Sequence, residues 1–185
     1  MTEPSEVVTK KPPSISGTIC LEWWGDLTGA TDPSRRNSGQ AAELRRAYDV
    51  LGVVSCPSYH ALKNRFAWLD HDNADHRRTL NRLAVVAHVL PFVRRHDDKS
   101  RVGQQMGRPP AGSSLPPISE QRFRRLVQVS RDDDLMQAMR RLVALLDNTV
   151  NVIDLSELIM WWGAPSRMKK LAFDYYSPTE KAQKT

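Results

Sequence analysis

Adjacent arginines are the residues of this sequence whose type and spacing best fit a chemical role. Of its 27 basic residues, 19 are arginine. Four arginine pairs lie in segments with helical periodicity: Arg45 with Arg46, Arg77 with Arg78, Arg124 with Arg125, and Arg140 with Arg141. A guanidinium group forms bidentate hydrogen bonds with phosphate, and pairs on helices place such groups in rows. The pattern indicates contact with a nucleic-acid backbone, whereas any one pair is more often part of a solvated helix face.

The positive charge lies in the body of the chain. The net charge is +6, which divides into −3 over residues 1–34, +6 over residues 35–101 and +3 over residues 102–185. With an isoelectric point near 9.6, a basic body is typical of proteins that bind nucleic acid. Ordinary solvated helix faces are the alternative that the charge leaves open.

Two clusters of potential metal ligands occur in the sequence. His71 and His76 flank two aspartates, but their spacing places them on different faces of a helix and matches no zinc signature. We interpret this segment as a polar turn before a helix. The three aspartates at residues 132–134 lack the alternating spacing of a calcium loop and suit the start of a helix. We therefore predict no metal and no cofactor.

The sequence offers no convincing catalytic nucleophile. Cys56 and His60 come nearest, and we interpret Cys56 as a small buried side chain. The sequence has neither the Gly-Lys-Ser/Thr of a phosphate-binding loop nor the Gly-x-Ser-x-Gly of a hydrolase. Cys20 and Cys56 are the two cysteines, which excludes a disulfide-rich scaffold and a cysteine zinc site. We predict that the protein is not an enzyme.

The length of 185 residues corresponds to one domain or two small ones. The longest nearly apolar run spans residues 83–93, about half of what a membrane-spanning helix requires. Residues 1–16 lack the apolar core of a secretory signal. We expect a cytoplasmic protein with no membrane partner.

Helical periodicity accounts for most of the chain. Apolar spacings of three and four residues predict helices over residues 20–27, 40–51, 58–70, 75–89, 119–127, 132–146, 154–162 and 166–176. No segment alternates with period two for long enough to predict a strand. The chain is therefore predicted to be all-α.

Some of these helices carry specific expectations. In the helix predicted over residues 40–51, Tyr48 and Leu51 share the apolar face and are expected in the core. In the helix predicted over residues 75–89, Arg82 is expected to point away from the core. Asp154 and Glu157 have the spacing of a capping box at a helix start.

Two tryptophan pairs also lie on predicted helices: Trp23 with Trp24, and Trp161 with Trp162. Because successive helical residues do not share a face, we expect one member of each pair to be buried and the other to lie at an edge or interface. An exposed tryptophan could stack on a base, but packing is the role that we favour.

The predicted architecture is a helical bundle in two packed halves joined by a long Gly/Pro-rich basic loop. The halves span residues 19–93 and 119–176, and the loop spans residues 94–118. Residues 1–18 are predicted to be a disordered tail, and residues 177–185 a polar tail.

An ordered set of short motifs over residues 20–176 resembles a known family. The motifs are residues 44–47 (LRRA), 66–68 (FAW), 106–111 (MGRPPA), 119–126 (SEQRFRRL), 139–142 (MRRL) and 161–163 (WWG). In order, spacing and helical context they resemble the CasB small subunit of the type I-E CRISPR surveillance complex, Cascade.

The resemblance implies a non-catalytic, all-helical subunit of an antiviral complex. Its implied partners are the other Cascade subunits, including the backbone filament and the large subunit, a second copy of itself, the crRNA, and the target and non-target DNA strands. Its basic faces would hold the guide–target duplex and the displaced strand and so stabilise the R-loop. By matching position, the implied backbone contacts are Arg45, Arg46, Arg131, Arg141 and Arg167. Arg77, Arg108 and Lys169 complete the set.

The chain also departs from the family pattern. Ala164, Pro165 and Ser166 stand where the family can have basic residues after Trp-Gly, and the loop over residues 28–39 is longer than expected. Three alternatives remain open. They are a stand-alone helical DNA-binding regulator, a metal-dependent enzyme that uses the histidine or aspartate cluster, and a structural adaptor without nucleic-acid contact.

Overall fold

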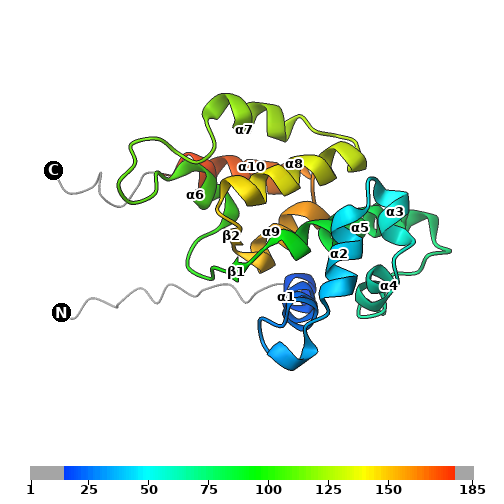
Figure 1. The fold of residues 1–185 in the computed structure, drawn as a ribbon. Helices are drawn as coiled ribbons and strands as arrows, with labels where there is room; N and C mark the ends of the chain where they lie inside the picture. The colour runs from blue at the N-terminus through cyan, green and yellow to red at the C-terminus, as the bar shows by residue number, and fades with distance from the viewer. Residues whose placement is uncertain (1–14, 178–185) are drawn as a thin grey trace, which may run out of the picture.

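The computed structural model of the protein describes residues 15–177 and is built largely of helices, which confirms the all-α prediction (Figure 1). Its α-helices are α1 (Ile15–Thr28), α2 (Ser38–Arg46), α3 (Val50–Val54), α4 (Pro57–Lys63), α5 (Arg77–Val89), α6 (Val102–Gly107), α7 (Glu120–Val127), α8 (Asp132–Leu145), α9 (Val152–Met160) and α10 (Pro165–Tyr175). Its 3₁₀ turns are η1 (Pro33–Arg35), η2 (Ala74–His76) and η3 (Leu90–Phe92). Two short strands, β1 (Arg95–His96) and β2 (Thr149–Val150), pair in parallel.

Helix α5 is the central element of the core. Residues 82–89 are all buried, because this part of the helix is apolar on most of its sides and packs against α3, α4, α8 and α9. In addition, α1 packs on α9, and α6 packs on α10. One continuous apolar core therefore includes residues from both predicted halves.

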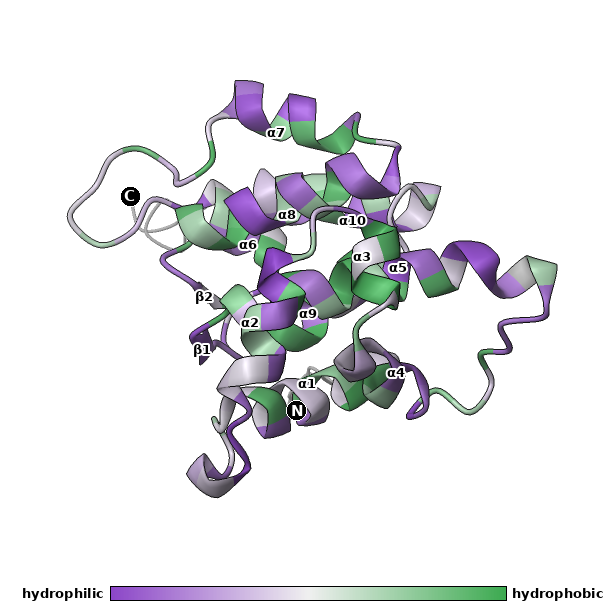
Figure 2. Cartoon of the chain, turned by 45° about the vertical axis from the view of Figure 1, so that its right-hand side comes forward, coloured by the Kyte–Doolittle hydropathy of each residue, from purple (hydrophilic) through white to green (hydrophobic). Residues whose placement is uncertain are grey.

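Helix α7 lies on the outer side of α8 and α10 in both views (Figures 1 and 2). It is held there by an aromatic stack in which the ring centroids of Phe123 and Tyr175 are 4.1 Å apart. The chain that follows α7 is held by Trp162, whose Nε1 donates to the carbonyl oxygen of Val129 at 2.7 Å. The arginines on the outer side of α7 remain exposed to solvent.

The segment over residues 94–118 contains β1 and α6, so the prediction of a loop is wrong for these parts. Its glycines allow close packing rather than irregular backbone. A Cβ on Gly103 would stand 2.7 Å from the Cβ of Asp174, and one on Gly107 would overlap the carbonyl oxygen of Tyr175. Only glycine lets α6 approach α10 this closely.

The helix predicted over residues 40–51 is divided into α2 and α3. The second of these begins at a new cap, where the side chain of Asp49 accepts a hydrogen bond from the N–H of Gly52 at 2.8 Å. A local side-chain cap competes with continuation of a helix. Tyr48 and Leu51 are consequently 86% and 73% exposed, and their prediction as core residues is wrong.

The helix predicted over residues 58–70 is also shorter, because α4 ends at Lys63. The chain between α4 and η2 is irregular. Phe66 and Leu69 are nevertheless buried, as their apolar spacing predicted. This irregular chain leads directly to the start of α5.

Asp154 and Glu157 do not form the predicted capping box. Helix α9 is capped by Asn151, whose side chain accepts from the N–H of Asp154 at 3.0 Å. Asp154 itself accepts from the N–H of Val102, the first residue of α6, at 2.8 Å. Glu157 forms an ion pair with Arg167. Both carboxylates therefore join α9 to other helices.

The two tryptophan pairs behave differently. Trp23 and Trp24 are both buried, against expectation, because α1 is covered by α9 on one side and by α2 and η3 on another. Trp162 is buried and Trp161 is 47% exposed, which confirms the prediction for the second pair.

The ends of the chain are described only in part. Helix α1 begins at Ile15, so the predicted tail is wrong for residues 15–18. Residues 1–14, and residues 178–185 of the predicted polar tail, lie outside the described residues. Within residues 15–177 the longest helices have 14 residues, and none combines the length and apolarity of a membrane span.

Candidate nucleic-acid interface

Ion pairs divide the arginines into two groups. Among the side chains that the structure describes, the arginines that pair with a carboxylate are Arg35, Arg65, Arg82, Arg101, Arg124 and Arg167. The others form no ion pair with a described carboxylate. A guanidinium whose charge is already balanced within the chain gains less from a phosphate than an unpaired one. The candidates for backbone contact are therefore those arginines of the predicted set that form no ion pair: Arg45, Arg46, Arg77, Arg108, Arg131 and Arg141.

Arg167 belongs to the paired group. Its side chain is only 14% exposed, with Nη2 2.6 Å from Oε2 of Glu157 and Nη1 3.8 Å from Oδ1 of Asp154. These contacts tie α10 to α9. The placement favours a structural role for Arg167 over contact with a nucleic-acid backbone.

Arg45 and Arg140 come from opposite halves of the chain and meet at the η3 turn. Nη1 of Arg45 donates to the carbonyl oxygen of Pro91 at 3.2 Å. The guanidinium of Arg140 lies over the ring of Phe92, with Cζ 4.9 Å from the ring centroid. Both residues remain exposed. These contacts orient the two guanidinium groups without neutralising their charge.

Arg46 and Arg141 are the chain neighbours of this pair and are also exposed. Neither has an ion pair among the described side chains. We call Arg45, Arg46, Arg140 and Arg141 the η3 arginine cluster. Like charges that gather without a carboxylate create a positive potential, and an anionic ligand relieves their repulsion.

Arg77 and Arg131, two further predicted backbone contacts, lie where α5 and α8 begin beside each other. There, Nδ2 of Asn81 donates to Oδ2 of Asp132 at 3.2 Å. Arg77 lies one helical turn before Asn81, and Arg131 directly precedes Asp132; both arginines are exposed. Since Arg140 meets the turn that follows α5, the two helices run in the same direction. About 14 Å of helix axis separates Arg131 from Arg140.

Arg108 and Lys169 lie in another part of the fold. Arg108 directly follows α6, and its Nε is buried without a hydrogen-bond partner among the described residues. Lys169 is exposed on α10, the helix against which α6 packs. The structure therefore does not bring these two residues into the η3 arginine cluster.

Arg82 fastens α8 to α5, which corrects the prediction that it points away from the core. Its side chain is 3% exposed, and Nη1 lies 2.9 Å from Oδ1 of Asp132. Burial lowers the pKa of Arg82, while the charge of Asp132 acts in the opposite sense. The next residue, Asp133, accepts from the N–H of Val50 at 2.9 Å. The aspartates stand in the first turn of α8, as predicted, and two of them also hold neighbouring segments.

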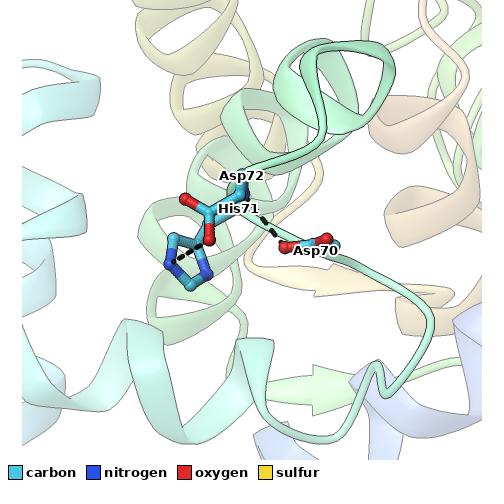
Figure 3. A group of neighbouring side chains, drawn as sticks. All are labelled: Asp70, His71 and Asp72. Atoms are coloured by element: carbon cyan, nitrogen blue, oxygen red, sulfur yellow. Dashed lines mark hydrogen bonds and ion pairs between the residues drawn. The ribbon is translucent and has the colours of Figure 1, made fainter.

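Asp70, His71 and Asp72 are the one group of potential metal ligands found among the described residues (Figure 3). The N–H of Asp72 donates to Oδ1 of Asp70 at 3.0 Å, and Nε2 of His71 lies 3.5 Å from Oδ2 of Asp72. Nδ1 of His76 accepts from the N–H of Asp70 at 3.1 Å. These contacts confirm the polar turn before α5. The absence of a metal stays a prediction.

Cys56 and His60 each contact a backbone oxygen. Sγ of Cys56 lies 3.3 Å from the carbonyl oxygen of Gly52, and Nε2 of His60 lies 2.8 Å from that of Val54. Burial raises the pKa of Cys56, which is opposite to what a thiolate nucleophile needs. Cys56 is a small buried side chain, as predicted.

The sequence-based set of contact residues omitted Arg140. The family resemblance implies a contact for Arg141 and none for Arg140, although the two form one of the four arginine pairs. What distinguishes Arg140 is its contact with Phe92, and no sequence pattern joins these residues.

The fold is all-helical, and at the η3 turn it holds two exposed arginines, Arg45 and Arg140, that form no ion pair with a described carboxylate. Residues 40–176 match the family described as CRISPR-associated protein Cse2, and the chain belongs to that family. The resemblance to the CasB subunit of type I-E Cascade is thereby confirmed.

A solved structure shares the fold. A chain in the crystal structure of E. coli Cascade bound to a PAM-containing double-stranded DNA target with a 32-nucleotide spacer matches with a TM-score of 0.61. The two chains are 22% identical, and the match covers 87% of this chain and 93% of that chain. No curated protein matches this sequence. Family membership makes the chain a CRISPR-associated protein.

Proposed function

We propose that this protein is a non-catalytic small subunit of Cascade that stabilises the R-loop. Its basic surface holds the backbone of the crRNA–target duplex and of the displaced non-target strand. The observation that carries the proposal is the η3 arginine cluster, where Arg45 and Arg140 are oriented by backbone and ring contacts and keep their charge.

Weak contacts suffice for this role. The guide–target duplex is about as stable as the DNA duplex that it replaces, so a modest gain in backbone contact shifts the equilibrium. The guide supplies sequence recognition, and the protein needs only phosphate contacts. Electrostatic contacts of this kind require neither a cofactor nor a catalytic group.

The contact set takes Arg45, Arg46 and Arg141 from the family resemblance and adds Arg140. Arg77 and Arg131 extend it toward the start of α5 and α8. Arg108 and Lys169 form a second basic region on α6 and α10. The proposed partners are the other Cascade subunits, including the backbone filament and the large subunit, a second copy of this chain, the crRNA and both DNA strands. The complex is proposed to act in the cytoplasm.

Charge reversal tests the proposal in the reconstituted complex. Arg45→Glu combined with Arg141→Glu removes two unpaired cations from the η3 arginine cluster. Arg122→Glu combined with Arg125→Glu makes the same change in charge on the outer side of α7 and is the matched control. Target binding is measured by gel shift over a series of salt concentrations.

We expect the cluster variant to bind target DNA at least about tenfold more weakly, with a salt slope smaller by about 2, because two phosphate contacts are lost. The control should keep the affinity and slope of the wild type, and both variants should load the guide. Equal target affinity for the wild type and the cluster variant would contradict the proposal. Sequence-specific duplex binding by the isolated chain would instead favour a stand-alone regulator.

A further inference from the structure

A hollow of about 510 Å³ lies between α4 and the start of α5. Its walls come from the end of α3, from α4 and the chain that follows it, and from the first two turns of α5. In Figure 2 this end of α5 is hydrophilic, while the later turns are largely hydrophobic. The volume lies within the range of sites that hold small organic ligands.

Part of the lining of the hollow is apolar. Val54, Tyr59 and Leu80 contribute to it. The Tyr59 hydroxyl donates to the carbonyl oxygen of Leu80 at 3.3 Å, which fixes the ring against the wall. The ring of His60 stands edge-on to that of Tyr59, with centroids 5.3 Å apart. Apolar and aromatic walls of this kind suit a flat heterocyclic ring.

Another part of the lining carries basic side chains, and we call it the edge of the hollow. Lys63 and Arg77 line it, and neither forms an ion pair with a described carboxylate. His71 also lines it, but Asp72 lies 3.5 Å from its ring and offsets any charge there (Figure 3). No carboxylate among the described residues lines the hollow. The N-terminal end of α5 adds partial positive charge. This edge therefore favours an anion.

We propose that this hollow binds one nucleotide, with the base against the apolar wall and the phosphate between Lys63 and Arg77. Asn64 and Asn81 also lie in the lining. Because Nδ2 of Asn81 already donates to Asp132, the groups that can hydrogen-bond the edge of a base are the amide of Asn64 and Oδ1 of Asn81. The nucleotide can be one unit of a single strand or a free mononucleotide. In the first case the inference rests on the proposed function, whereas in the second it stands alone.

Calorimetry on the full chain tests the proposal with two probes, AMP and a single-stranded DNA of 12 nucleotides. Lys63→Gln combined with Arg77→Gln removes the charge at the edge, and neither side chain forms a hydrogen bond or ion pair with the described residues that the change would break. Arg122→Gln combined with Arg125→Gln removes the same charge from α7 and is the control. Amide NMR shifts of Asn64 and Leu80 in the wild type report where each probe binds.

We expect at least one probe to shift these amides and to bind about tenfold more weakly to the Lys63/Arg77 variant, with little change in the control. If AMP behaves in this way, the ligand is a free nucleotide; if only the oligonucleotide does, the ligand is a unit of a strand. Unshifted amides, or equal affinities for the wild type and the variant with both probes, would overturn the proposal.

The two proposals fail in different ways. If reversal at Arg45 and Arg141 weakens target binding while the Lys63/Arg77 variant binds both probes like the wild type, the proposed function stands and the nucleotide site is wrong. If AMP binding depends on Lys63 and Arg77 while charge reversal at Arg45 and Arg141 leaves the affinity for target DNA unchanged, the nucleotide site stands and the proposed function is wrong.

Discussion

The guanidinium of Arg140 lies over the ring of Phe92, with its Cζ 4.9 Å from the ring centroid. The contact joins α8 to the η3 turn, where Arg45 also donates to the carbonyl oxygen of Pro91. Because an aromatic ring attracts a cation without neutralising it, Arg140 is held in place and stays available to phosphate. The η3 turn therefore organises arginines from two distant parts of the chain.

Replacing Phe92 with leucine should loosen this arrangement while keeping an apolar side chain. We expect a loss of about 0.5–1 kcal/mol in the free energy of unfolding, measured by urea denaturation. Target affinity of the complex should fall a few-fold because Arg140 is no longer oriented. Phe173→Leu, an exposed aromatic on α10, is the control and should change neither quantity. Unchanged stability and affinity in Phe92→Leu would show that the ring does not position Arg140.

The buried pair of Arg82 and Asp132 should matter far more than an exposed pair. Arg82→Met leaves a half-buried carboxylate without its partner, and we expect a cost of about 3 kcal/mol in the free energy of unfolding. Arg101→Met removes a pair with Asp174 in which the arginine side chain is 51% exposed. That change should cost less than about 1 kcal/mol. Similar losses for the two variants in urea denaturation would contradict this ranking.

The glycines of α6 should resist substitution. In Gly107→Ala the new Cβ overlaps the carbonyl oxygen of Tyr175, so α6 must move away from α10. We expect a destabilisation of about 2–3 kcal/mol, measured by thermal or urea unfolding. Gly39→Ala is the matched control, because Gly39 is exposed in α2 and its added Cβ meets only Asn37 Oδ1 at 3.8 Å. The control should be neutral or slightly stabilising, and an equal loss in both variants would refute the packing argument.

Two histidines should make the fold sensitive to acid. Burial lowers the pKa of both His88 and His96 below the ordinary value of 6.5. Nδ1 of His88 lies 2.8 Å from the carbonyl oxygen of Leu44, so in the neutral ring it carries the hydrogen and donates. Nδ1 of His96 accepts from the N–H of Val152 at 3.1 Å, so protonation there breaks a hydrogen bond.

The sign of the pH effect follows from these shifts. As the pH falls below about 6.5, the unfolded chain takes up protons at His88 and His96 before the folded chain does, so stability decreases. Urea denaturation between about pH 7.5 and 5, above the main titration of the carboxylates, should show this loss. The His88→Asn and His96→Asn double variant should show a flatter profile, since both groups no longer titrate. A level wild-type profile over this range would refute the prediction.

Local sequence determined much of the secondary structure and the basic character of the surface. The all-α class follows from apolar side chains spaced at three and four residues, which depends only on the helical repeat. The polar turn around His71 and the burial of Cys56 follow from similarly local features. The four arginine pairs also follow from the sequence alone, and the nucleic-acid contact that they predict stays a prediction.

Tertiary structure decided which charges are available. Arg167 and Arg82 look like the other arginines in sequence, but carboxylates on α9 and α8 neutralise them, while Arg45 and Arg140 keep their charge at η3. The glycines of α6 likewise predict a loop from the sequence, but in the structure they allow α6 to pack closely on α10. The reason is physical: ion pairing and close packing depend on distances between segments far apart in the chain, whereas periodicity and capping depend only on neighbouring residues.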